Sequence, residues 1–260
     1  MNKVLFLIIG VSLGACLQAQ PDPKDLMQKS RKQTLVSGME SKTTLEIHDG
    51  KGNSRIRETS MVSRIFPDGT EKRLLVFLSP ADVKGTAMLI FDYSDKEDDL
   101  WIYLPALRKS RKIVASEKSK SFMGSEFTNA DLSAGNPDEW IYALDGSEVI
   151  GDTDCWKIRM TPASDKIAAE NGIKDKVNWV GKQDLMPRRV VYNGNDGKPL
   201  RELNYLAFKK MDPAKNQYTV TLMEVKNLKN SRFSRMIMED IKVNPQVKEE
   251  FFTLQYIEKQ

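Results

Sequence analysis

Histidine and cysteine are nearly absent from this chain, whose 260 residues include one histidine and two cysteines. A Ser-His-Asp or Cys-His catalytic site would have to use His48. The sequence has neither the Cys/His spacing of a zinc site nor a glycine-rich phosphate loop. Residues 123–127 hold a Gly-Ser pair but lack the second glycine of a nucleophile elbow. We therefore expect no enzyme activity, no metal and no cofactor.

The scarcity of cysteine also limits cross-linking. Cys16 falls in the N-terminal leader, so Cys155 stands alone and an internal disulfide is excluded. Its strand-like surroundings indicate a small buried apolar residue. The net charge of +4 is too small to indicate a nucleic-acid partner. With 40% apolar and 29% charged residues, the chain has an ordinary globular composition and the length of one large or two small domains.

The first 19 residues are typical of a secretory signal peptide rather than of a buried N-terminal helix. Lys3 provides the positive charge, and residues 4–13 form an apolar core too short to span a bilayer. Two processing routes fit. Cleavage after Ala19 gives a signal of residues 1–19, whereas a bacterial lipobox ends the signal at residue 15 and places a lipid on Cys16. Both predict export, the first of a diffusing protein and the second of a membrane-anchored one.

The mature chain is predicted to be mainly β with a few helices (α+β). Asp22 and Pro23 open a helix that runs to about Gln33, residues 37–38 break it, and residues 20–38 form a helix and linker. A short helix is predicted in 245–252. Turn signals at about every 8–12 residues favour a large antiparallel meander over alternating β and α units. The expected strands are 43–48, 54–66, 72–78, 86–93, 100–104, 139–149, 155–160, 176–180, 188–192, 200–208, 218–228 and 234–243.

Three of these strands are apolar at every position of residues 74–78, 88–91 and 100–104. Side chains alternate between the two faces of a strand, so both faces of this part of the sheet need cover. One face is expected to pack on helices, and the other to line an apolar cavity. The alternative is that both faces are simply buried by a second sheet or by helices, since short apolar runs fit either arrangement.

Basic residues cluster between residues 108 and 120, and Glu117 is the only acidic residue in this stretch. Such a patch suits lipid phosphates or an acidic partner protein. A solvated hairpin is the plainer alternative. The candidates for contact with head groups at the rim of a cavity are Arg108, Lys109, Arg111 and Lys112.

Three stretches together resemble the outer membrane lipoprotein-sorting protein family, the LolA-like periplasmic carriers. They are residues 77–86 (FLSPADVKGT), 100–109 (LWIYLPALRK) and 121–132, which contains SFMGSEF and ADL. The resemblance extends less sharply from about residue 40 to the C-terminus. It implies one domain over residues 39–260: a curved antiparallel sheet that forms an open half-barrel, with helices covering its concave face.

The resemblance also implies a function. Members of this group hold acyl chains between sheet and helices, so we expect a non-enzymatic periplasmic carrier of lipids or lipoproteins that serves an envelope membrane protein or transporter. The chain is longer than LolA, and lipidation at Cys16 would make it an anchored receptor or carrier instead. The alternative is a cell-envelope structural or interaction module without a cavity. The candidate cavity-lining residues are Phe77, Leu89, Phe91, Trp101, Tyr103, Phe122 and Phe127.

Overall fold

The computed structural model describes residues 20–212 and 217–259 of the chain. The predicted signal peptide and the lipidation candidate Cys16 lie outside the described residues. Their processing therefore stays a prediction, as does the division of the chain at residue 38.

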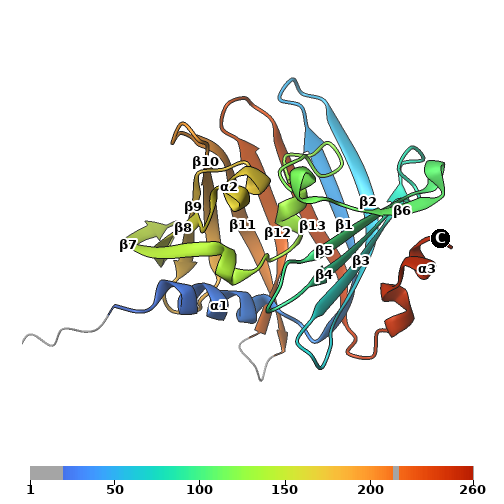
Figure 1. Ribbon diagram of the computed structural model, residues 1–260, viewed down its shortest axis with the longest axis horizontal. Coiled ribbons are helices and arrows are strands. Elements are labelled where there is room, and N and C mark those ends of the chain that lie inside the picture. The colour runs from blue at the N-terminus through green and yellow to red at the C-terminus, as the bar shows by residue number, and fades with distance from the viewer. Residues whose placement is uncertain (1–19, 213–216, 260) are drawn as a thin grey trace, which may run out of the picture.

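One antiparallel sheet of 13 strands forms the molecule (Figure 1), and its spatial order is β6-β5-β4-β3-β2-β1-β13-β12-β11-β10-β9-β8-β7. The sheet curves but does not close, so the fold is mostly β and open, as predicted. The strands are β1 Gly38–His48, β2 Ser54–Ile65, β3 Glu71–Ser79, β4 Ala87–Asp92, β5 Asp99–Leu104, β6 Lys109–Lys112, β7 Trp140–Ile150, β8 Thr153–Pro162, β9 Asp175–Gly181, β10 Pro187–Asn193, β11 Pro199–Asp212, β12 Gln217–Asn227 and β13 Phe233–Val243.

The strand order explains why a long segment must cross the sheet. The chain starts at the centre with β1 and meanders outward to the edge strand β6. It then restarts at the opposite edge with β7 and meanders back until β13 pairs with β1. Residues 113–139, here called the connecting segment, link the two edges. This segment holds the short 3-10 helices η2 (Ala115–Glu117), η3 (Asn129–Leu132) and η4 (Pro137–Glu139).

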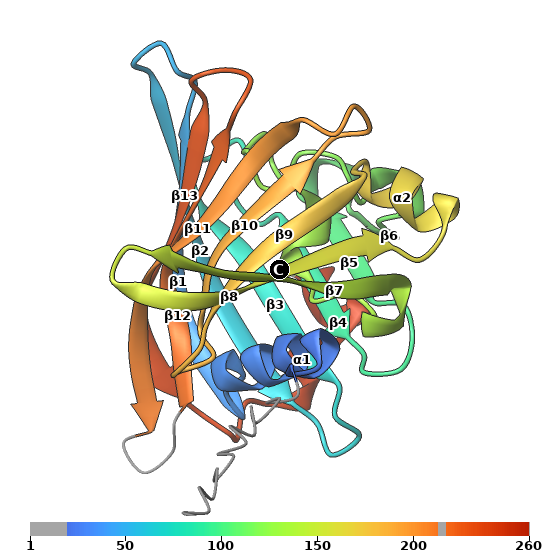
Figure 2. The same cartoon turned by 90° about the vertical axis from the view of Figure 1, so that its left-hand side faces the viewer.

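Three short α-helices complete the described fold: α1 (Pro23–Thr34), α2 (Asp165–Asn171) and α3 (Leu254–Ile257). Two further 3-10 turns are η1 (Pro105–Leu107) and η5 (Glu249–Phe252). Figures 1 and 2 show α1 at one end of the strands and α2 near the other end. Helix α1 contacts β7, β9 and β12, and α3 contacts β4.

The local signals explain most of these boundaries. Helix α1 begins after Asp22, whose carboxylate accepts the backbone N–H of Lys24, with Pro23 in its first turn. The predicted break at Gly38 is instead the first residue of β1. A Cβ atom there would lie 2.2 Å from the carbonyl oxygen of Asn244, so the close approach of these two backbones admits only glycine.

The two faces of β3–β5 are both buried, but by different parts of the chain. On the inner face, Leu75, Met88 and Leu100 join the main core with residues of the connecting segment. On the outer face, Leu74 and Leu89 pack under a C-terminal cover formed by residues 247–257. Simple burial therefore explains the apolar character of both faces in this half of the sheet.

Candidate ligand cavity beneath helix α1

A cavity of about 270 Å³ lies in the other half of the sheet, between α1, strands β7–β12 and the connecting segment. Its volume is just below the roughly 300–1,000 Å³ that is typical of small-molecule sites. Apolar and aromatic side chains of α1 and of several strands contribute to its wall. They include Met27, Trp140, Tyr142, Met160, Val190, Leu203, Tyr205 and Val220.

Helix α1 forms one side of the cavity, and its two apolar residues, Leu26 and Met27, both pack against the sheet. Leu26 is buried against Ile158 of β8 and Val180 of β9, which fixes the helix on the sheet. Met27, Arg31 and Thr34 follow one another at spacings of four and three residues and therefore share the face that lines the cavity. The helix thus supplies both apolar surface and a guanidinium group to the interior.

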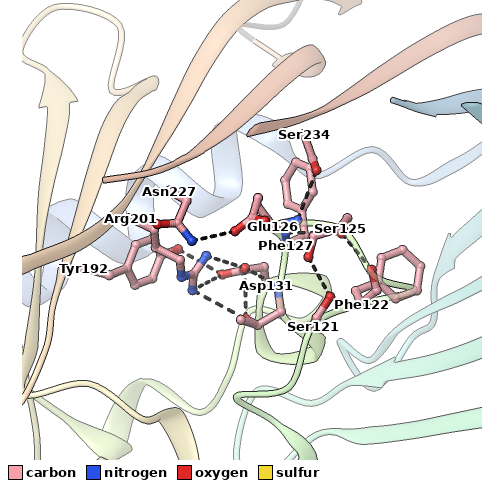
Figure 3. Close-up of polar contacts among 11 residues, drawn as sticks. Ser121, Phe122, Ser125, Glu126, Phe127, Asp131, Tyr192, Arg201, Asn227 and Ser234 are labelled. Carbon is pink, nitrogen blue, oxygen red and sulfur yellow. Dashed lines mark hydrogen bonds and ion pairs between the residues drawn. The ribbon is translucent and has the colours of Figure 1, made fainter. Parts of the chain in front are cut away.

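The connecting segment is pinned to the inner face of the sheet by polar contacts (Figure 3). The backbone N–H of Glu126 donates to the Ser234 hydroxyl at 3.0 Å, and the Glu126 carboxylate accepts from the Asn227 amide at 2.9 Å. Arg232 forms an ion pair with the same carboxylate at 2.6 Å. These contacts fix the sequence motif of residues 121–132 in place, so the motif has a structural role that needs no ligand.

Asp131 joins this segment to the cavity wall through a buried polar cluster (Figure 3). Its two oxygens accept from Arg201 at 2.6 and 3.0 Å, and the Tyr192 hydroxyl donates to Oδ1 at 3.0 Å. Burial alone would raise the pKa of Asp131, but Arg201 and the donors of Thr128 hold it below its ordinary value. The Arg201 guanidinium also stacks 3.6 Å from the Tyr192 ring centroid. The charge of Asp131 is thus already neutralised within the protein.

Lys176 of β9 also faces the cavity, and its ammonium lies 4.1 Å from the ring centroid of Trp140. Burial lowers the pKa of Lys176 to about 8, and the positive charge of Arg201 adds to this effect, whereas Asp131 opposes it. A smaller cavity of about 60 Å³ adjoins the first, and Lys176 and Trp140 line both. Lys176 and Trp140 therefore stand at the junction of the two spaces.

None of the seven residues predicted to line a cavity is among the residues that line this one. Phe77, Phe122 and Phe127 are buried in the main core, where they pack the connecting segment on β1–β5. The remaining four lie on the outer face with the C-terminal cover, and Tyr103 among them is nearly fully buried. These four are Leu89, Phe91, Trp101 and Tyr103. A ligand contact for any of the seven stays a prediction.

The four basic rim candidates lie at or beside the edge strand β6, and none of them lines the cavity. Arg111 forms an ion pair with Glu117 at 2.7 Å, and Lys112 pairs with Asp99. Arg108 ends η1 in the left-handed conformation, and Lys109 is exposed at the start of β6. A head-group role for this patch stays a prediction.

His48 and Cys155, the residues that a catalytic site would have used, have ordinary surroundings. His48 stacks on Phe233 with ring centroids 4.2 Å apart, and Cys155 is fully buried, as predicted. In residues 20–212 and 217–259, no three His, Cys, Asp or Glu side chains come together as a metal site. Within the same described part of the chain, no helix is both long enough and apolar enough to cross a membrane.

Lys176 and Arg201 were not among the predicted site residues, because the prediction relied on strands that are apolar at every position. The signal was in β9, where Lys176, Asn178 and Val180 alternate with Val177 and Trp179. Both sets are largely buried, so the pattern alone did not show which set faces a cavity. Only the position of α1 and the connecting segment decides that the set with Lys176, Asn178 and Val180 lines the cavity.

Comparison with known proteins places this architecture in a class. A crystal structure of a DUF1329 family protein from Desulfovibrio piger is 28% identical, with a TM-score of 0.81 over 91% of this chain and 100% of that one. One described as an outer membrane lipoprotein-sorting protein domain, from Vibrio parahaemolyticus, is 22% identical, with a TM-score of 0.81 over 91% and 98%. A LolA superfamily protein from Nitrosomonas europaea is 16% identical, with a TM-score of 0.69 over 91% and 100%.

The open, strongly curved sheet with few helices is therefore a LolA-like fold. A family model described as "Uncharacterized protein" matches residues 69–259, which is most of the chain. The chain belongs to this family, and its resemblance to the outer membrane lipoprotein-sorting proteins of the LolA-like superfamily is confirmed. No curated protein matches it.

Proposed function

We propose that this protein is a non-enzymatic periplasmic carrier that holds the acyl chain of a lipid or lipoprotein in the cavity beneath α1. The observation that supports the proposal is a cavity of about 270 Å³, lined by both apolar and polar side chains, between α1 and a sheet of LolA-like fold. In this proposal α1 is the cover of the concave face, and an envelope membrane protein receives or delivers the cargo.

Burial of hydrocarbon would drive binding. Each methylene group removed from water contributes about 0.8 kcal/mol, so six buried methylenes would contribute about 5 kcal/mol before association costs. The aromatic rings of Trp140, Tyr142 and Tyr205 offer flat apolar surface to such a chain. A chain of this length suits a cavity of this size better than a bulky multi-chain lipid does.

The direct experiment is native mass spectrometry of the purified mature protein together with titration of a fluorescent fatty acid. The carrier should copurify with lipid and should bind the probe. Val190→Phe fills the cavity from β10 and is expected to weaken probe binding at least tenfold, because the added ring occupies the space of the chain. Val149→Phe makes the same change at an exposed position of β7 and should leave binding unchanged.

The second candidate is a structural or interaction module of the cell envelope without a ligand. The dense packing of β3–β5 on both faces favours it. Absence of copurified lipid, together with equal probe binding by the wild type and Val190→Phe, would support this candidate and overturn the carrier proposal.

Export and anchoring are part of the proposal. We propose that residues 1–19 direct the chain to the periplasm, and that its N-terminus is either free after cleavage or anchored through a lipid on Cys16. The mass of the mature N-terminus distinguishes the two, because a lipidated Cys16 adds the mass of acyl chains and a cut after Ala19 removes this cysteine.

A further inference from the structure

The amine of Lys176 is a charged group in the cavity without a counterion. Among the described residues, none forms a hydrogen bond or an ion pair with it, and it lies over the Trp140 ring, 4.1 Å from the ring centroid. Lys176 is partly buried, and cations that are largely removed from water are ordinarily paired, because the loss of hydration destabilises an unpaired charge. This position is therefore an exception that the packing of the fold does not explain.

The nearby carboxylates do not form an ion pair with the Lys176 amine. Asp131 is engaged by both nitrogens of Arg201 and by the Tyr192 hydroxyl. Glu139 lines only the smaller cavity and acts on Lys176 at a distance. The amine thus lines the cavity without a direct ion pair, and the two carboxylates stabilise its charge only from a distance.

The surroundings of the amine are amphipathic. The same cavity is lined by the apolar side chains of Met160, Val190 and Leu203 and by Met27 of α1. Arg31 and Arg189 add two further positive groups to the same wall, and Arg189 is already paired with Glu202. A cavity that combines apolar side chains with a cation lacking a direct ion pair matches a molecule that has a hydrocarbon chain and an anionic end.

We infer that the cargo is a single-chain anionic amphiphile, whose terminal carboxylate or phosphate is bound by the ammonium of Lys176 beside the Trp140 ring while its chain lies toward α1. This inference rests on the proposed carrier function and adds the chemical class of the cargo. With its pKa at about 8, the amine is mostly protonated at neutral pH and can form a charge-assisted hydrogen bond to such a group.

The test compares four probes that share a 12-carbon chain, each used below its micelle concentration in calorimetric titrations. Dodecanoate and dodecyl phosphate carry the two anionic ends, dodecanol is neutral and dodecyltrimethylammonium is cationic. The wild type should bind both anions more tightly than dodecanol and should bind the cation weakest. The tighter of the two anions identifies the head group, and inorganic phosphate tests the anion without a chain.

Lys176→Met removes the charge and keeps an unbranched apolar side chain in the cavity. It should weaken binding of the two anions by about tenfold or more and leave dodecanol binding unchanged. The variant should fold at least as stably as the wild type, because it removes a partly buried charge that has no direct ion pair. Lys174→Met removes one charge at an exposed position two residues earlier and should change nothing.

The outcomes separate the inference from the function on which it rests. Equal affinities for dodecanol and dodecanoate, with no effect of Lys176→Met, would overturn the inference and leave the carrier function standing. Equal affinities for inorganic phosphate and dodecyl phosphate would overturn the amphiphile assignment in favour of a free-anion site. Failure of all four probes to bind would overturn the carrier function itself.

Discussion

The two halves of the sheet share the same antiparallel meander, but one half is packed on both faces and the other holds a cavity. Around β3–β5 the strands are apolar on both faces, and both faces are filled, by the connecting segment inside and by the C-terminal cover outside. Around β8–β11 the inner face carries Lys176, Asn178 and Arg201 among apolar residues, and there the sheet leaves a cavity. The most apolar strands are thus the packed ones.

This contrast teaches that strand hydrophobicity alone does not locate a ligand site. A strand that is apolar on both sides can bury both faces against its own chain, which is the densest and most stable outcome. The cavity lies where the inner face mixes apolar and charged groups. The predictions below test this division of the molecule, from the largest effect to the smallest.

Leu89→Asp should have the largest effect and should act on stability rather than on ligand binding. Leu89 is fully buried between the outer face of β4 and the C-terminal cover, so the new carboxylate would have no partner. We expect a loss of about 4 kcal/mol or more in the free energy of unfolding, measured by urea denaturation. Leu78→Asp, at a half-exposed position of β3, is the matched control and should cost far less. Comparable losses at both positions would contradict the packed-half description.

Asp131→Ala should destabilise the protein by about 3–5 kcal/mol, because it leaves the buried guanidinium of Arg201 without its counterion. The Tyr192 hydroxyl loses its acceptor in the same variant. Asp138→Ala breaks an exposed ion pair with Lys24 and should cost less than about 1 kcal/mol. Thermal and urea unfolding of both variants measure the difference, and a small loss for Asp131→Ala would show that the connecting segment is held mainly by its apolar residues.

The stability of the wild type should fall as pH rises from 5 to 7. Burial beside Asp92 raises the pKa of Asp98 to about 7, from about 3.9 in an unfolded chain. The folded protein therefore keeps a proton that the unfolded chain has lost in this range, so the contribution of Asp98 is present below pH 4 and is lost through pH 7. The slope from this one group is at most about 1.4 kcal/mol per pH unit.

Asp98→Asn should flatten this slope, since an amide does not titrate. Part of the slope will remain, because burial also raises the pKa of Glu71 in the same cluster. The variant also loses one acceptor for the backbone N–H groups of Tyr93 and Gly135, so the slope and not the absolute stability is the readout. Asp95→Asn changes an exposed carboxylate nearby and serves as control. An unchanged slope in Asp98→Asn would rule out Asp98 as its source.

Much of the fold could be predicted from local sequence signals. The capping pair Asp22-Pro23 predicted the start of α1, and the regular turn signals predicted the hairpins, two of which contain Asp-Gly pairs at 49–50 and 196–197. Strand β6 was missed because its four residues, Lys-Ser-Arg-Lys, carry no apolar pattern. Helix α2 was missed although Ser164 caps its start and Gly172 its end.

The site was harder to predict than the fold for a physical reason. Whether a buried residue faces a cavity depends on which distant segment covers it, and no local pattern encodes that. Trp101 and Tyr103 were predicted to line a cavity, but their face of β5 meets the C-terminal cover. Lys176 acquires its position only when α1, β7 and the connecting segment come together around β9.

Photo-crosslinking with a fatty acid that carries a diazirine in its chain tests the central claim most directly, since it reports where hydrocarbon resides in the folded protein. We predict labels on peptides of α1 and β8–β11, at side chains such as Met27, Met160 and Tyr205, and a sharp loss of label in Val190→Phe. Labels on the peptides that contain Leu89 or Trp101, with equal yield in Val190→Phe, would contradict the account.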